Sequence, residues 1–254
     1  MSQLLNYKLE GEGHTVVLIH GLFGNLDNLG LLARELKKRF QVLSIDLRNH
    51  GLSFHSDSHT YQQQAEDVLS LLQHLNIQQC SIIGHSMGGK VAMKVTAMAQ
   101  HMVDKLVVLD MAPVAYHVAR HDNVIQGLKA VQQAQPAHRK EALEILAQHI
   151  EMEGVRQFLG KSLYKNHDHF SWRFNVDSLQ KNYWDILDWE TVPPVKVPTL
   201  FIKGGESDYL TAEHQPLVKK QFVNAKAHVI SNTGHWLHAE KPAEVLRAIT
   251  KFFT

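Results

Sequence analysis

The sequence predicts an α/β fold in which helices cover both faces of a mainly parallel sheet and a helical cap is inserted late in the chain. Short apolar runs bounded by turn residues alternate with longer amphipathic stretches. The runs are apolar at nearly every position, as expected for strands that are buried on both faces. The alternation stops after Pro113 and resumes only near residue 195. This order of elements is typical of βαβ units with one large insertion.

The individual elements follow from this alternation. We expect strands at 15–20, 41–46, 80–85 and 105–110, with helices at 28–40, 61–75 and 87–100 between them. After the insertion we expect strands at 197–205 and 225–231 and helices at 215–222 and 242–253. Residues 114–194 contain amphipathic helical stretches at 123–134 and 136–150 but hardly any buried-strand run. We therefore divide the chain into an α/β core, 1–113 and 195–254, and a helical cap, 114–194, with Pro193, Pro194 and Pro198 at the return.

Composition narrows the range of partners. The chain has 254 residues, of which 44% are hydrophobic and 20% charged, and its net charge is +1. Such a charge creates no field that would attract nucleic acid or anionic lipid. The first residues lack the pattern of a signal peptide, and no apolar stretch is long enough to span a membrane, so we expect a cytoplasmic protein. The single cysteine, Cys80, begins an apolar run and is expected in the core.

Residues 82–91, IIGHSMGGKV, match two functional motifs. Gly84, Ser86 and Gly88 spell G-x-S-x-G, the sharp strand-to-helix turn that exposes a nucleophilic serine. The same stretch spells most of a phosphate-binding loop, G-x-x-x-x-G-K, which ends at Lys90. The phosphate loop lacks its magnesium-binding hydroxyl, because Val91 follows the lysine, and two βα units precede it. The serine turn is therefore the preferred interpretation.

A serine nucleophile also needs amides to stabilise an oxyanion. Met87 follows the serine at the start of the expected helix, where its N–H is free of intrahelical bonds. Enzymes with this turn take a second amide from the loop after an earlier strand, here HGLFGN at 20–25. We expect Leu22 to supply it, with Phe23 as the next candidate. An ordinary βα turn is the structural alternative for this loop.

The general base is expected in NTGHWLHAEKP, after the last strand. His235 lies in this loop directly before the closing helix, and His238, three residues later, is the fallback. An acid must then hold the imidazole. The order serine, acid, histidine suits either Asp110, after the strand at 105–109, or Asp208 in GGESDYL. A strand-end acid needs a partner, whereas an acid in a Gly-Ser-Asp turn can simply cap the turn, so Asp110 is preferred and Asp208 is the alternative.

Other polar clusters have structural explanations. In DLRNHGLS, 46–53, we expect Asp46 and Arg48 to brace the loops by charged hydrogen bonds. His117 with His121, and His167 with His169, are spaced like metal ligands but lack the H-E-x-x-H pattern, so we predict no metal and no cofactor.

Taken together, these motifs resemble the α/β-hydrolase superfamily over nearly the whole chain. More narrowly, VLIHGLFGNLDNLG, DLRNHGLS, GHSMGGKVAM, LDMAPVAYHVARHD, WRFN and GHWLHAEKP resemble the YbfF-type esterases, small hydrolases of acyl-CoA and simple acyl esters. The resemblance implies Ser86 as nucleophile, His235 as base and Asp110 as acid. Asn49 departs from the glycine that is common in this superfamily, which puts the shape of its loop in question.

The resemblance implies hydrolysis of an ester or thioester through an acyl-enzyme on Ser86, with a small-molecule acyl substrate and no cofactor. Two other functions remain open on this fold, namely a carbon–carbon bond hydrolase or lyase and a non-catalytic receptor for a small ligand. Substrate-binding candidates are aromatic residues as pocket walls and two arginines as anchors for an anionic or CoA-bearing substrate. Packing in the cap would equally explain the aromatic residues, and surface ion pairs would equally explain the arginines. The candidates are Phe23, Tyr116, Arg120, Trp172, Arg173, Phe174 and Trp236.

Overall fold

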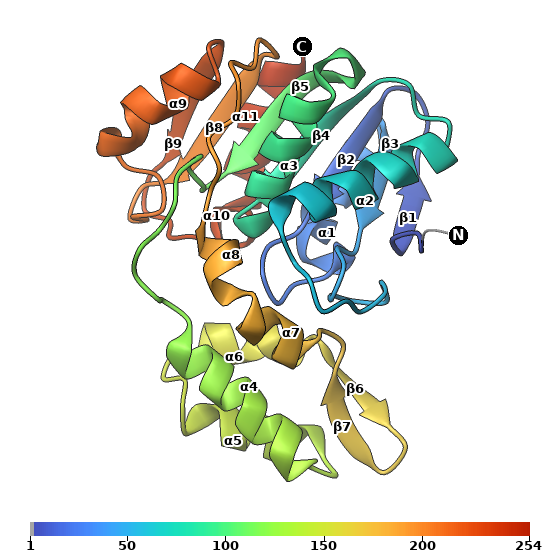
Figure 1. Cartoon of the computed structure of the whole chain (residues 1–254), viewed down its shortest axis with the longest axis vertical. Helices are drawn as coiled ribbons and strands as arrows, with labels where there is room; N and C mark the ends of the chain where they lie inside the picture. The colour runs from blue at the N-terminus through green and yellow to red at the C-terminus, as the bar shows by residue number, and fades with distance from the viewer. Residues whose placement is uncertain (1–2) are drawn as a thin grey trace.

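A seven-stranded sheet forms the centre of the computed structural model, which describes residues 3–254 (Figure 1). Its strand order is β1-β3-β2-β4-β5-β8-β9, and every neighbouring pair is parallel except β1 with β3. The strands are β1 Tyr7–Glu10, β2 Thr15–Ile19, β3 Gln41–Ile45, β4 Cys80–His85, β5 Val103–Leu109, β8 Thr199–Gly204 and β9 Ala225–Ile230. The predicted mainly parallel sheet is confirmed. β1 was not predicted, because its largely exposed side chains leave no apolar run.

Helices cover both faces of this sheet (Figure 1). Apolar side chains of α1 and α11 pack on one face, and those of α2, α3 and α9 pack on the other. Because both faces are covered, neighbouring residues of one strand enter different cores, as Ile82 and Ile83 of β4 do. The helices and 3₁₀ turns of this part are η1 Leu26–Leu29, α1 Gly30–Leu36, α2 Tyr61–His74, α3 Met87–Met98, η2 Gln100–Met102, η3 Ala212–His214, α9 Gln215–Gln221, α10 Leu237–Glu240 and α11 Pro242–Phe253.

Cys80 is buried at the start of β4, as expected, and burial raises the pKa of its thiol to about 12. No helix within residues 3–254 is long and apolar enough to cross a membrane.

Between β5 and β8 the chain leaves the sheet and forms a layer of helices below it (Figure 1). This insertion also contains a two-stranded antiparallel hairpin, β6 with β7, which the sequence did not reveal. Each hairpin strand has one buried residue among partly exposed ones, so no buried-strand pattern exists there. The elements are α4 Asp122–Ala134, α5 Arg139–Ala147, α6 Glu153–Gly160, β6 Leu163–Asn166, β7 His169–Trp172, α7 Val176–Lys181 and α8 Tyr183–Leu187.

The carboxyl ends of the parallel strands all meet at the sheet edge that faces the insertion (Figure 1). Ser86 follows β4 directly, Asp110 follows β5, and the loop that carries His235 follows β9. Side chains far apart in the sequence are thereby brought to one edge, which is where open α/β sheets bind ligands.

Candidate active site

Ser86 lies on a strained turn between β4 and α3. Its backbone has φ 55° and ψ −124°, a conformation that L residues rarely adopt. The turn is possible because two glycines flank it. A Cβ at Gly84 would lie against the Gly88 carbonyl, and a Cβ at Gly88 would lie against the carbonyls of Ile19 and His20. The requirement for small residues at these two places therefore has a steric cause.

A continuous chain of hydrogen bonds starts at Ser86. Its Oγ lies 2.8 Å from Nε2 of His235, and Nδ1 of His235 lies 2.7 Å from Oδ2 of Asp110. Because a carboxylate only accepts, Nδ1 carries the proton, which leaves Nε2 free to accept the serine proton. The arrangement can activate a hydroxyl nucleophile.

Asp110 is completely buried, and three groups donate to its carboxylate. The Gly204 amide bonds Oδ1 at 3.0 Å, while the hydroxyl of Ser207 and the ring of His235 both donate to Oδ2. Asp208, the alternative acid, lies elsewhere. It is 70% exposed at its side chain and pairs with Arg120 at 2.5 Å, and that pairing lowers its pKa. The structure therefore brings Asp110, and not Asp208, to the imidazole.

The rings of Tyr209, His85 and Trp236 lie around His235. Tyr209 stacks on it with ring centroids 4.0 Å apart, and Nε2 of His85 donates to the His235 carbonyl at 2.9 Å. His238 packs on His85 and does not bond Ser86. Burial lowers the pKa of His238 to about 3, which keeps it neutral. Tyr209 and His85 were not predicted from the sequence, because only packing between elements places them here.

The oxyanion candidates differ in whether their amides are free. Met87 is the first residue of α3, and neither its amide nor that of Leu22 has a hydrogen-bond partner within residues 3–254. The Phe23 amide, by contrast, donates to Nε2 of His50 at 3.1 Å. Leu22 and Met87 can therefore both receive an oxyanion, whereas Phe23 cannot.

A cavity of about 510 Å³ opens at Ser86, a size that suits a small ligand. One part of its wall is apolar and comes largely from α6 and the residues before it, and another part is polar. The apolar wall is formed by Ile150, Met152, Val155, Phe158 and Leu159, and the polar wall includes Arg120, His121, Asn123 and Tyr209.

Three of the predicted pocket residues line this cavity, namely Phe23, Arg120 and Trp236. Tyr116, Trp172, Arg173 and Phe174 are not among its lining residues, for different reasons. Tyr116 donates its hydroxyl to the Tyr209 carbonyl behind the cavity wall. Trp172 stacks on Phe174 within the insertion and donates to Leu128, whereas Arg173 lies over the ring of Tyr164.

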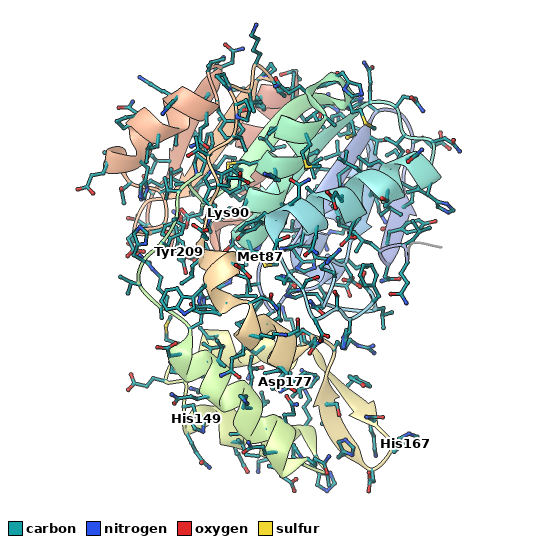
Figure 2. All side chains as sticks on the ribbon, viewed as in Figure 1. Met87, Lys90, His149, His167, Asp177 and Tyr209 are labelled. Atoms are coloured by element: carbon teal, nitrogen blue, oxygen red, sulfur yellow. The ribbon has the colours of Figure 1, made fainter. Side chains whose placement is uncertain are left out.

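Lys90, the lysine of the phosphate-loop pattern, points to backbone carbonyls of the insertion. Figure 2 shows it with Met87 and Tyr209 where the sheet meets the insertion. Its ammonium is buried and donates to the carbonyls of Leu187 and Asp188, both at 2.9 Å. Within residues 3–254 no three His, Cys, Asp or Glu side chains gather as metal ligands would.

The loop after β3 contains the other predicted polar residues. Arg48 bonds Asp67 on α2 through two nitrogens, at 2.6 and 2.9 Å, and Asp46 accepts from the amides of Leu26 and Leu52. Asn49 adopts φ 65°, so it takes the left-handed conformation that a glycine would otherwise supply.

Comparison with known proteins identifies the family. A family model described as "Alpha/beta hydrolase family" matches residues 16–248. The chain belongs to this family. The predicted α/β-hydrolase fold is thereby confirmed.

Two curated relatives cover almost the whole chain. A "Putative esterase/lipase" of Haemophilus influenzae is 49% identical over 98% of this chain and 88% of its own length. "Esterase YbfF" of Escherichia coli is 46% identical over 93% of this chain and 92% of its own. A solved structure titled "Marine microorganism esterase" matches with a TM-score of 0.96 and 38% identity, over 99% of this chain and 100% of the other. The resemblance to YbfF-type esterases is confirmed, and these relatives support an ester-hydrolase role.

Proposed function

We propose that this hydrolase cleaves carboxylic esters through an acyl-enzyme on Ser86. The observation that carries the proposal is the chain of hydrogen bonds from Ser86 Oγ through His235 to the buried Asp110 at the wall of a cavity. His235 removes the serine proton as Oγ attacks the ester carbonyl. The amides of Leu22 and Met87 stabilise the oxyanion of the tetrahedral intermediate.

The imidazolium formed in this step returns its proton to the leaving alcohol, and Asp110 stabilises its charge. A water molecule, deprotonated by His235, then attacks the acyl-enzyme and releases the acid. Tyr209 and the His85 bond to the His235 carbonyl keep the ring in place throughout. No step requires a cofactor or metal.

The two walls of the cavity indicate how an ester binds. The apolar side chains of α6 suit an aliphatic acyl group. Arg120 is the one arginine or lysine among the described lining residues, and Asp208 already neutralises it. This charge balance favours a neutral ester over the polyanionic thioester of coenzyme A, for which a cation cluster is expected. Residues 114–194 would then act as the cap that selects the acyl group.

The test is active-site labelling with a fluorophosphonate probe, followed by turnover of p-nitrophenyl esters and butyryl-CoA. We expect native protein to be labelled and Ser86→Ala and His235→Ala to be neither labelled nor active. Two exposed control substitutions outside the cavity, Ser231→Ala and His228→Ala, should leave both properties intact. Turnover that survives in Ser86→Ala would refute the acyl-enzyme. An unlabelled, inactive native protein would instead favour a ligand-binding receptor.

Arg120→Met separates the two substrate classes. We expect KM to be unchanged for a neutral ester and no specific loss for butyryl-CoA, because Arg120 already has an anionic partner. A KM that rises for the acyl-CoA alone would show that Arg120 anchors that substrate.

A further inference from the structure

The loops after β2 and β3 are joined by two buried histidines whose bonds run in opposite directions. His20, in the first loop, accepts the amide of Leu47 at Nε2, at 3.1 Å. His50, in the second loop, accepts the amide of Phe23 at Nε2, also at 3.1 Å. The two rings lie 5.1 Å apart. Each loop therefore supplies an acceptor for a backbone amide of the other.

The partners of each ring determine its tautomer. Nδ1 of His20 lies 2.7 Å from the Gly21 carbonyl, and Nδ1 of His50 lies 3.0 Å from the Arg48 carbonyl. Because a carbonyl only accepts, each Nδ1 carries the proton and each Nε2 is a bare acceptor. A protonated ring would lose this acceptor. Burial lowers the pKa of both histidines, so both stay neutral.

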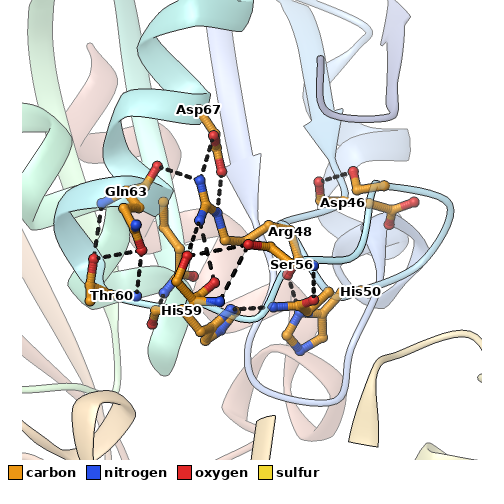
Figure 3. A network of polar contacts seen from close by, with 12 residues as sticks. Asp46, Arg48, His50, Ser56, His59, Thr60, Gln63 and Asp67 are labelled. Atoms are coloured by element: carbon orange, nitrogen blue, oxygen red, sulfur yellow. Dashed lines mark hydrogen bonds and ion pairs between the residues drawn. The ribbon is translucent and has the colours of Figure 1, made fainter. Parts of the chain in front are cut away.

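The residues that hold His50 are themselves fixed. The Arg48 guanidinium bonds the Asp67 carboxylate, and Figure 3 shows this pair together with His50, which follows in the same loop. This ion pair anchors the loop after β3 to α2. The position of the His50 acceptor is thereby set by the core.

The consequence lies at Phe23, which has φ 61°, a left-handed conformation that is unfavourable for a bulky residue. The bond to the buried His50 ring occupies the Phe23 amide, so this amide cannot donate to an oxyanion. The preceding amide, that of Leu22, is left without a partner within residues 3–254, and Leu22 is one of the residues that line the cavity. The same loop is closed by the Gly24 amide, which bonds the Gly21 carbonyl at 3.1 Å.

We propose that His20 and His50 are positioning residues, and that the His50 acceptor determines that Leu22 and not Phe23 donates to the oxyanion. This inference rests on the proposed esterase mechanism. His50 touches no substrate. It acts by stabilising the strained turn that aims the Leu22 amide, so its loss weakens binding of the transition state and leaves the bound ester unaffected.

The test compares His50→Leu, which lacks the acceptor, with His50→Gln, whose side-chain oxygen can replace Nε2. Each is assayed for kcat, for KM with a p-nitrophenyl ester and for affinity toward an alkyl boronic acid, which forms a tetrahedral adduct on serine. Gln64→Met is the matched control, since Gln64 is buried and its side chain, within residues 3–254, bonds only the nearby His59 carbonyl.

For His50→Leu we expect kcat and boronate affinity to fall together by about 10–100-fold, with KM within twofold of the native value. His50→Gln should recover most of both losses, and Gln64→Met should lose neither. Native values of kcat and boronate affinity in folded His50→Leu would overturn the proposal. So would equal losses in His50→Leu and His50→Gln, since these would indicate a general packing role.

A measurement on the native protein covers the case in which His50→Leu does not fold. Two-bond nitrogen–proton couplings report the tautomer of each histidine, and we expect His20 and His50 to be protonated at Nδ1. A proton on Nε2 of His50 would overturn the proposal irrespective of activity. Failure of the proposed function has a different signature, namely a native protein that is inactive or that keeps its turnover in Ser86→Ala.

Discussion

The buried ammonium of Lys90 should make the stability of this protein rise with pH above neutrality. The side chain is 1% exposed and bonds the two carbonyls that end α8. Burial lowers the pKa of Lys90 from 10.5 to about 7, and the nearby Asp188 only partly opposes this change. The perturbation we choose is Lys90→Met, which keeps much of the volume and removes the titrating group.

The magnitude follows from the two pKa values. One pKa unit is worth about 1.4 kcal/mol, so burying the ammonium costs about 5 kcal/mol at pH values below 7. Between pH 7 and 10.5 the unfolded chain binds this proton and the folded protein does not. The free energy of unfolding therefore rises with pH in this window, by up to about 1.4 kcal/mol per pH unit, and is independent of Lys90 titration below it.

The assay is urea unfolding of native protein and Lys90→Met at pH 6.5, 7.5, 8.5 and 9.5. The difference between the two proteins removes the contribution of all other groups. Relative to Lys90→Met, we expect the free energy of unfolding of native protein to rise by about 2.5 kcal/mol between pH 7.5 and 9.5. Lys94→Met is the control for losing a lysine. Lys94 lies on the same helix and pairs with Glu190. Parallel curves for native protein and Lys90→Met would refute the reasoning, because they would mean that Lys90 does not titrate in this range.

Three further predictions concern the site. Ser207→Ala removes a hydroxyl that donates to Asp110, so kcat/KM for a p-nitrophenyl ester should fall about tenfold while the melting temperature changes little. Gly88→Ala forces a Cβ against backbone and should lower the free energy of unfolding by about 1–3 kcal/mol. Gly154→Ala places its Cβ in open space and should not lower it. Equal urea midpoints for the two variants would contradict this. Val155→Trp fills space beside the apolar wall of the cavity. The ratio of kcat/KM for acetyl esters to kcat/KM for octanoyl esters should therefore rise about tenfold. An unchanged ratio would place the acyl group elsewhere.

The buried strands and the serine turn could be predicted because both depend on local sequence. A parallel strand covered on both faces must be apolar along its length, as residues 80–85 are. The turn at Ser86 needs small neighbours for steric reasons that follow from the chain itself. The β6–β7 hairpin could not be predicted, because its half-exposed strands have no distinctive hydropathy pattern.

The pocket residues were predicted with mixed success for a related reason. Phe23 and Trp236 lie next to motif residues, and they line the cavity. Trp172 and Tyr116 are expected as pocket walls, but packing within the insertion and against Tyr209 places them elsewhere. The apolar wall on α6 was not foreseen, since an apolar helix face equally suits a core or a cavity.

By itself, the sequence determined the order of the buried parallel strands and of the helices between them, the strained turn at Ser86 and the loop that carries His235, because spacing and side-chain size act within a few residues of one another. Only the tertiary structure decided that Asp110 and not Asp208 bonds His235, and that His50 accepts a hydrogen bond from the Phe23 amide. These choices join segments that are separated by 27 to 125 residues. Which of two chemically equivalent groups reaches a partner over such a separation depends on how the whole core packs.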